Sequence, residues 1–443
     1  MITALWTAVS GMSANGTTLS VVGDNIANMN TTAFKSNRAT FSDVLSATIT
    51  GVSSQNSVGR GTQLDAITPL FTQGSMISTG NPLDMAIDGN GFFMVKDSNG
   101  TYYTRAGNFS LDKDGYLVTT SGMKVQGYMA TDASATFLQG NNFSGKLSDV
   151  RVDSTANAAK ATTTVNLNIN LNSTATVVSA AFTLDGNGDG VKNDPKNYSF
   201  SSTTTVYDSH GGSHEVTAYF AKSSANSWKV YYVSDDPAKS NSLIQASSPQ
   251  VLTFDTNGVL VNDGTAASSA EPAIKFNFGS DVVYTQNITF DYGKSLNQGG
   301  TGLNASSQLA DSFQVLNATQ DGRAPGVMKG LSIDEAGTIY GVFTNGQSRV
   351  LGKMALTRFN APDKLTKMGQ NLFRESNSSG QAITGIPKTS GMGRVLSGSL
   401  EQSNVDLAGE FVTMIAAQRA FQANSRTVTT VDDMMQEILS LKR

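Results

Sequence analysis

SNVDLAGEFVTMIAAQRAFQANSRTVTTVDDMMQEILSL, residues 403–441, contains no Pro and carries an apolar stripe at alternating steps of three and four residues. Ser403 and Asp406 form a start that resembles a capping box, so the pattern predicts one helix that ends near Leu441. The members of the stripe are Leu407, Phe411, Met414, Phe421, Val428, Met435 and Leu439. A stripe of this kind needs a partner surface, and that partner decides the fold.

The opening of the chain carries a matching stripe. The pattern predicts a helix over residues 3–26, with Gly16 and Gly23 at small positions of the stripe. Its apolar members are Leu5, Val9, Met12, Leu19 and Ile26. A β-rich body offers little surface that fits such stripes, so the expected partners are the other terminal helix and copies in neighbouring molecules. We therefore predict an assembly subunit with both stripes at its interface.

An ordinary two-helix hairpin within one molecule is the competing interpretation, because an apolar stripe most often belongs to an intramolecular core. In the C-terminal segment, however, Val412, Ile415 and Val431 widen the apolar face beyond a narrow seam. This helix then has more than one contact surface, which favours a packed tube of helices. Isolated helices of this length are marginal in water, so we predict that both are disordered in the monomer.

The composition limits the class of protein. The 443 residues suffice for two to four domains. The formal charge is −4 and charged residues make up 15% of the chain, against roughly 25% in average globular proteins, so nothing indicates nucleic-acid binding. There is no Cys, which excludes disulfides and thiolate metal sites. No membrane insertion is expected, and the opening MITALWTAVSGMSANG lacks the basic region of a cleaved secretory signal peptide.

Between the terminal segments the chain is predicted to be β. Residues 165–171 alternate strictly between apolar and polar side chains. A turn pattern, Asp followed three residues later by Gly, occurs at Asp88, Asp112, Asp255 and Asp334, and we expect a hairpin at each. The predicted fold class is therefore multidomain, with mainly β outer domains and a coiled-coil-like α-helical domain formed by the N- and C-terminal segments.

Changes of texture along the chain divide it into four predicted parts. The inserted part is bounded by polar, turn-rich stretches and is richest in Ala, Ser, Thr and Asn. The parts are a terminal helical core domain, 1–30 with 403–443; an extended or irregular connector, 31–70; a discontinuous inner β domain, 71–148 with 303–402; and an inserted outer β domain, 149–302.

Motifs for catalysis and metal binding are mostly absent from the sequence. Neither HExxH nor GxSxG occurs, and His210 and His214 flank the turn of an expected hairpin, where a structural role is favoured. Asp185, Asn187 and Asp189 could supply the first oxygen ligands of a calcium loop, but Lys196 occupies the position that requires an acid. We expect no catalytic residue, no cofactor and no metal. An ordinary turn is favoured over calcium binding at this loop.

Four segments, in this order, carry a resemblance to a known family. They are SANGTTLSVVGDNIANMNTTAFKSNRATFSDVL (13–45), STGNPLDMAIDGNGFFMV (78–95), YTRAGNFSLDKDGYLVTTSGMKVQGY (103–128) and GSLEQSNVDLAGEFVTMIAAQRAFQANSRTVTTVDDMMQEIL (398–439). In these segments the chain resembles the bacterial flagellar rod and hook protein family. The resemblance covers roughly residues 1–150 and 300–443. The total length and the large insertion are similar to those of the members that form the hook.

The resemblance implies a structural role. It implies unprocessed export through the flagellar type III pathway and polymerisation into the flexible curved tube that transmits torque from rod to filament. The terminal helices would line the inner tube, the β domains would lie outside it, and the connector would lock neighbouring subunits together. The implied partners are further copies of the chain in a helical homopolymer, the distal rod protein, the hook cap, the hook-filament junction protein and the export apparatus.

Two other interpretations stay open from the sequence. A distal rod protein of the same family would be expected to lack the long insertion that this chain contains. A secreted β-rich carbohydrate-binding or hydrolytic protein belongs to a different class. Sugar or calcium affinity in residues 150–300 would favour it.

Overall fold

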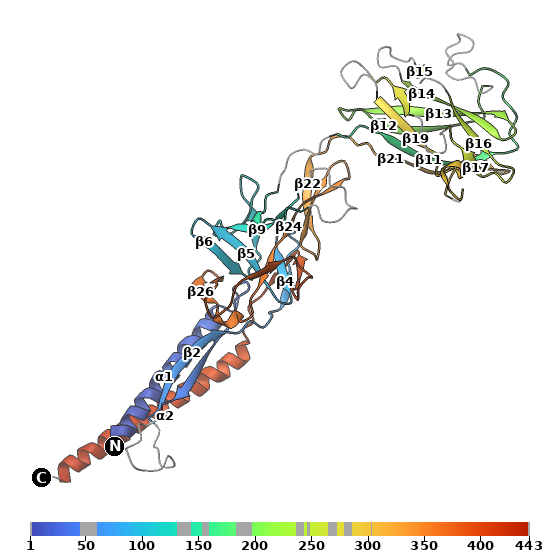
Figure 1. Cartoon of the computed structure of the whole chain (residues 1–443). Helices are drawn as coiled ribbons and strands as arrows, with labels where there is room; N and C mark the ends of the chain where they lie inside the picture. The colour runs from blue at the N-terminus through green and yellow to red at the C-terminus, as the bar shows by residue number, and fades with distance from the viewer. Residues whose placement is uncertain are drawn as a thin grey trace. The chain divides into compact units, whose positions relative to one another are not determined.

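A computed structural model describes residues 2–44, 60–130, 143–152, 159–182, 197–235, 243–245, 249–264, 273–278, 286–302 and 304–441. The chain divides into two compact units. Unit 1 comprises Met1–Ser154, Lys329–Val342 and Gln347–Arg443, and unit 2 comprises Thr155–Met328 and Phe343–Gly346. Strands dominate, and one helix lies at each end of the chain (Figure 1). The predicted fold class is confirmed.

Each terminal segment forms a helix in unit 1. α1 spans Ile2–Ala27 and α2 spans Leu407–Leu441, as the two stripes predict. The predicted capping box is wrong, because Asp406 is itself the N-cap and its Oδ1 accepts a hydrogen bond from the Ala408 amide at 3.1 Å. Ser403 lies before the helix begins.

The segment that follows α1 contains a hairpin, where the sequence suggested an extended or irregular connector. β1 (Asn37–Asp43) pairs antiparallel with β2 (Thr62–Pro69), and both lie along α1 (Figure 1). The register shifts at Asp65, the extra residue of a β-bulge. A bulge interrupts the alternation of side chains along a strand, which explains why residues 62–69 show no clean period.

The remainder of unit 1 is mainly β. Two short antiparallel pairs join distant parts of the sequence, β3 (Met76–Ser78) with β30 (Ser399–Glu401) and β4 (Met85–Asp88) with β29 (Arg394–Ser397). The largest described sheet contains β5 (Phe92–Asp97), β6 (Gly100–Thr104), β7 (Phe109–Leu111), β8 (Leu117–Thr119), β9 (Lys124–Met129), β10 (Ser148–Asp149), β22 (Met328–Ile333), β23 (Thr338–Phe343), β24 (Ser348–Met354), β25 (Leu356–Arg358), β26 (Thr366–Gly369), β27 (Leu372–Arg374) and β28 (Ile383–Gly385), and a 3-10 helix, η3, spans Pro362–Lys364. Its main path runs β22, β23, β24, β9, β5, β6, β27, β26.

Unit 2 consists of two sheets that share one hydrophobic core. One sheet contains β11 (Thr164–Asn172), β18 (Ala273–Phe276), β19 (Gln286–Asp291), β20 (Ser307–Leu309) and β21 (Gln314–Gln320), and the other contains β12 (Phe200–Tyr207), β13 (Ser213–Ser224), β14 (Ser227–Asp235), β15 (Leu243–Gln245), β16 (Gln250–Phe254) and β17 (Leu260–Asn262); a 3-10 helix, η2, spans Leu296–Gln298. Trp228 and Phe220 from one sheet and Phe290 from the other are buried in the core. Because β20 and β21 pair with β11, unit 2 extends beyond residue 302.

The predicted Asp and Gly turn forms a hairpin at three of its four places. Asp112, Asp255 and Asp334 each accept, at 2.7 Å, a hydrogen bond from the backbone amide four residues later, between β7 and β8, β16 and β17, and β22 and β23. The prediction is wrong at Asp88. There β4 pairs with β29, and the carboxylate accepts hydrogen bonds from Arg394 and Gln73.

Candidate assembly interface

The two terminal helices of unit 1 pack antiparallel along each other. Nδ2 of Asn25 in α1 donates a hydrogen bond to Oε1 of Glu410 in α2 at 2.8 Å. Gly11 precedes Asn25 by as many residues as Asn424 follows Glu410, and these two residues are also in contact. A Cβ at position 11 would lie 2.7 Å from Nδ2 of Asn424. α2 continues past the N-terminal end of α1 (Figure 1). The predicted pairing of the two terminal segments is thus confirmed.

Small side chains form much of the contact between the helices. The buried residues are Ala8, Val22 and Asn25 of α1 and Ala417 and Val431 of α2. Four of these five were missed from the sequence, because Ala, Asn and a single Val do not stand out in a stripe of larger apolar side chains. At Gly16 and Gly23, the predicted small positions, an added Cβ would have nothing within 4 Å. The helices therefore approach closely at Gly11, where an added Cβ would displace the Asn424 side chain, and not at those two positions.

The predicted interface residues divide into two groups on these helices. Half-buried positions are Met12, Leu19 and Ile26 of α1 and Leu407, Met414 and Val428 of α2. Exposed positions are Leu5 and Val9 of α1 and Phe411, Phe421 and Met435 of α2. Leu439 belongs to α2, but its side chain lies outside the described part of the chain. One molecule by itself therefore covers only part of each stripe.

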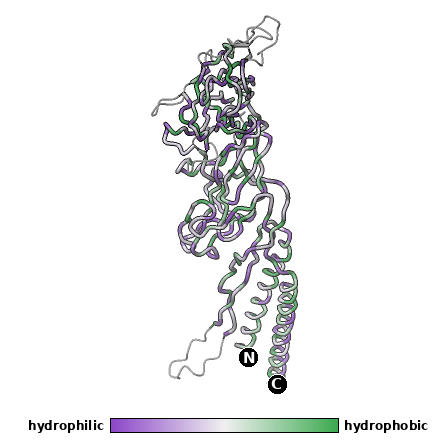
Figure 2. Tube along the Cα trace, turned by 90° about the vertical axis from the view of Figure 1, so that its right-hand side faces the viewer, coloured by the Kyte–Doolittle hydropathy of each residue, from purple (hydrophilic) through white to green (hydrophobic). Residues whose placement is uncertain are grey.

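Further apolar side chains of the helices are exposed. Trp6 of α1 is 67% exposed, and Val412 and Ile415 of α2 are 68% and 50% exposed. Met434 and Ile438 near the end of α2 are exposed as well. Figure 2 shows apolar residues recurring along both helices. Exposed apolar side chains that recur along a helix indicate a protein–protein contact.

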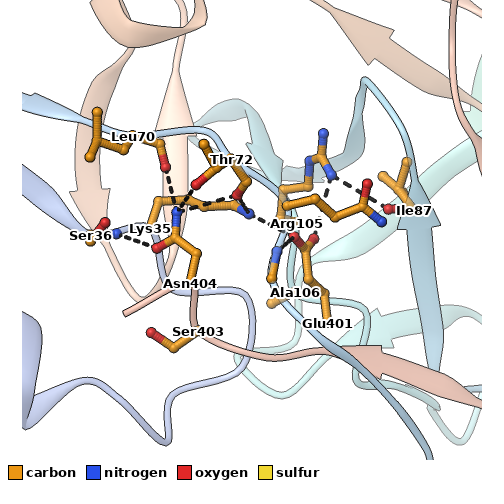
Figure 3. Close-up of polar contacts among 12 residues, drawn as sticks. Lys35, Ser36, Leu70, Thr72, Ile87, Arg105, Ala106, Glu401, Ser403 and Asn404 are labelled. Atoms are coloured by element: carbon orange, nitrogen blue, oxygen red, sulfur yellow. Dashed lines mark hydrogen bonds and ion pairs between the residues drawn. The ribbon is translucent and has the colours of Figure 1, made fainter. Parts of the chain in front are cut away.

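A buried charge cluster lies between the segment that leaves α1 and the strand that leads towards α2 (Figure 3). Oε1 of Glu401 in β30 accepts hydrogen bonds from Nζ of Lys35 at 2.6 Å and from the Gly74 amide at 2.9 Å. Oε2 of Glu401 lies 3.4 Å from Nη1 of Arg105, and the three charged side chains are at most 5% exposed. Burial lowers the pKa of Lys35 and of Arg105, and the Glu401 carboxylate opposes both shifts.

Asn404, in the segment before α2, bonds to the residues on both sides of the β1–β2 hairpin. Its Oδ1 accepts a hydrogen bond from the Ser36 amide at 2.7 Å, and its Nδ2 donates to the Leu70 carbonyl at 2.8 Å and to Oγ1 of Thr72 at 2.8 Å (Figure 3). Ser36 immediately precedes β1, and Leu70 immediately follows β2. Together with the Glu401 cluster, these contacts fix the base of the hairpin to the segment that enters α2.

The other residues singled out in the sequence are the candidate calcium ligands and the two imidazoles. Asp185, Asn187 and Asp189, the candidate calcium ligands, lie outside the described residues. Among the described side chains, no group of three or more His, Cys, Asp or Glu could hold a metal ion. Nε2 of His214 lies 2.8 Å from Oδ2 of Asp208, and its ring stacks on Phe278, so this imidazole braces the hairpin of β12 and β13.

Within the described residues, neither α1 nor α2 combines the length and the hydrophobicity that crossing a bilayer would require.

The chain is similar to known proteins along nearly its whole length. Four family models match it in order: the flagella basal body rod protein at residues 5–35, the flagellar hook protein FlgE/F/G D1 domain at 86–187, the flagellar basal body protein FlaE D2 domain at 170–323, and the flagellar basal body rod FlgEFG protein C-terminal model at 396–441. The flagellar hook protein FlgE of Escherichia coli (strain K12) is 35% identical over 436 residues, covering 98% of this chain and 99% of that protein. The chain belongs to the flagellar hook protein family.

Other hook proteins are similar to this chain over most or all of its length. The flagellar hook protein FlgE of Borreliella burgdorferi is 33% identical over 468 residues, with both chains covered completely. A crystal structure of the Helicobacter pylori flagellar hook protein FlgE2 matches the fold with a TM-score of 0.50 at 17% identity, over 72% of this chain and 98% of that one. The chain is therefore a structural subunit of the bacterial flagellar hook. The matches also span the long insertion, which a distal rod protein would be expected to lack.

Proposed function

We propose that this subunit forms the flexible curved tube that transmits torque from rod to filament, as a helical homopolymer held together by α1 and α2. The observation that carries the proposal is the apolar surface that remains exposed after the two helices have paired. Phe411 and Val412 of α2 and Trp6 of α1 are at least 49% exposed. Contacts with neighbouring copies would bury this surface, and apolar burial is the main driving force of association.

The predicted interface residues take two roles in this proposal. The half-buried members of each stripe, such as Met12 and Met414, support the pairing of α1 with α2. The exposed members, such as Leu5, Phe411 and Phe421, contact neighbouring copies. Met435 lies where α2 has passed the end of α1, so its partner would come from another subunit.

The proposed mechanism is mechanical. A hook bends while it rotates, so the helical core must stay fixed while β surfaces of neighbouring subunits slide by small shears. The cluster of Lys35, Arg105 and Glu401 would hold the helices to the β part of unit 1 under load, because breaking a buried charge pair is costly. A low content of charged residues, 15% of the chain, would keep sliding surfaces free of strong attraction or repulsion.

The route of export and the neighbours at the two ends of the tube also belong to the proposal. We infer export by the flagellar type III apparatus without a cleaved signal peptide. At its ends the polymer would contact the distal rod protein, the hook cap and the hook-filament junction protein. The four-part division, with an inner tube of residues 1–30 and 403–443 and β domains outside it, stays part of this proposal.

Negative-stain electron microscopy under polymerising conditions tests the proposal. Full-length protein is expected to form tubes, and a variant that lacks residues 1–30 and 403–443 is expected to stay monomeric. Phe411→Asp should abolish tubes, because it places a charge in an apolar contact, whereas Thr427→Asp, at an exposed polar position roughly 160° around the same helix, should retain them. Monodisperse particles from the full-length protein under every condition would contradict self-assembly.

A further inference from the structure

The hairpin of β1 and β2 turns an apolar face away from its own molecule. Phe41 pairs directly with Leu64, and Ile67 pairs with Ala39. The bulge at Asp65 keeps Leu64 and Ile67 on the same face although they are three residues apart. Phe41, Leu64 and Ile67 are 36%, 46% and 47% exposed.

The opposite face of this hairpin is polar or small, and its middle is half-buried. Thr40 pairs with Ala66, and Thr68 lies on the same side. We take these half-buried residues as the face towards α1, because α1 packs along the hairpin and Phe41, Leu64 and Ile67 on the other face are exposed. The usual arrangement, apolar face inside and polar face outside, is therefore reversed. A two-stranded ribbon is marginally stable alone, so an apolar outer face requires a cover.

α2 offers a surface of matching chemistry on the side away from α1. Val412, Ile415 and Arg419 follow one another at helical spacings of three and four, so they share one face. Ala417, which is buried against α1, lies roughly 160° around the helix from Ile415 at about 100° per residue. The outer face thus presents two exposed apolar side chains followed by a cation.

The hairpin carries the complementary charge at a matching distance. Asp43 has the same parity along β1 as Phe41, so it lies on the apolar face, and it is exposed. The rise from Phe41 to Asp43 along a strand is about 6.6 Å, and the rise from Ile415 to Arg419 along a helix is about 6 Å. A helix placed with Ile415 over Phe41 therefore brings Arg419 to Asp43.

We propose that the outer face of this hairpin receives the outer face of α2 from a second copy of the chain, with Ile415 on Phe41 and Leu64 and with Arg419 paired to Asp43. The inference rests on the proposed self-assembly and specifies one of its contacts. It also assigns the reversed hairpin a role, because its cover arrives only with the neighbouring subunit. The same contact would join the segment after α1 of one copy to the C-terminal helix of the next.

Charge reversal with rescue tests the pairing in the full-length protein. Asp43→Arg and Arg419→Asp are each expected to raise the critical concentration for tube formation about tenfold, measured by sedimentation and electron microscopy. The double variant should return to within about threefold of the original value, because the pair is restored with opposite sign. Lys113→Asp, an exposed reversal in the turn between β7 and β8, should change it little.

Disulfide trapping gives a second test that does not depend on assembly strength. Because the chain contains no Cys, every disulfide in a mixture of a Leu64→Cys variant and an Ile415→Cys variant joins two molecules, and each variant alone measures the cross-links between identical positions. Cross-linked dimers are expected in tubes. Thr413→Cys is the control, because Thr413 is exposed on α2 but lies roughly 160° around the helix from Ile415.

The outcomes separate this contact from self-assembly in general. The docking alone would be overturned if the unchanged protein forms tubes, neither charge reversal has an effect, the double variant shows no rescue, and trapping is equal at positions 413 and 415. Absence of tubes from the unchanged protein would overturn the proposed function and the docking with it. Rescue by the double variant together with trapping confined to position 415 would support both.

Discussion

Unit 2 and the terminal helices bury their side chains in opposite ways. The two Trp residues illustrate the contrast, since Trp228 of unit 2 is 0% exposed and Trp6 of α1 is 67% exposed. Unit 2 encloses large aromatic side chains between two sheets, whereas the helices bury mainly Ala and Val against each other and leave large apolar side chains outside. Unit 2 thus has a core of its own, whereas in the proposed tube contacts with neighbouring copies would supply much of the stability of the helices.

Core truncation in unit 2 should give the largest difference between the two regions. Phe220 is fully buried, so Phe220→Ala is expected to lower the free energy of unfolding of unit 2 by about 3–5 kcal/mol. Urea unfolding followed by Trp228 fluorescence, in a Trp6→Phe background, measures the loss. Val412→Ala on the outside of α2 should change this free energy by less than about 0.5 kcal/mol and raise the critical concentration for assembly. Equal unfolding effects would refute the contrast.

The buried charge cluster is the next most sensitive place. Glu401→Gln leaves Lys35 and Arg105 buried without an anion, so unit 1 is expected to lose about 3 kcal/mol. Glu335→Gln is the matched control, because Glu335 also meets two cations, Lys388 and Arg394, but at the surface, where solvent screens the pairs and little or no loss is expected. Thermal unfolding by circular dichroism compares the two. Similar losses would show that burial does not set the strength of the cluster.

The seam between the helices can be tested with a pair of glycines. Gly11→Ala places a Cβ 2.7 Å from the Asn424 amide nitrogen, so we expect a cost of about 1 kcal/mol, or a roughly fivefold higher critical concentration for assembly. Gly16→Ala meets nothing within 4 Å and should instead stabilise α1 by up to about 1 kcal/mol. Equal responses at both positions would mean that the antiparallel seam does not form in tubes.

The smallest expected effect is a pH dependence confined to unit 2. Burial works against ionisation of Asp321, but hydrogen bonds from Lys160, Thr164 and Thr163 outweigh it and lower its pKa to about 2. Because the folded pKa is depressed, this stabilisation is complete above about pH 4 and is lost as the pH falls towards 2. It amounts to about 1 kcal/mol after allowance for solvent screening. Asp321→Asn should remove this component from Trp228-monitored unfolding curves, and an unchanged pH slope would contradict it.

Local chemistry made much of the fold predictable. The stripes predicted both helices to within about two residues, and the Asp and Gly turns predicted three hairpins, because helix period and turn geometry depend on neighbours in sequence. Prediction failed where a distant partner competed. Asp88 forms no hairpin because β29, some 300 residues later, pairs with its strand. The hairpin of β1 and β2 escaped prediction because the bulge at Asp65 breaks its alternation.

The sequence predicted which apolar residues of the helices belong to the candidate interface, but not how these residues are arranged in space. The sequence by itself determined that the chain has two terminal amphipathic helices around a β body with too few matching surfaces, since apolar periodicity is a local property. Only the tertiary structure decided which side of α2 meets α1, because apolar side chains occur on both sides and Ala417 and Val431 are too small to mark the seam. It alone brought Lys35, Arg105 and Glu401 together. Charges hundreds of residues apart form a buried cluster only through the path of the chain, and no local pattern encodes that path.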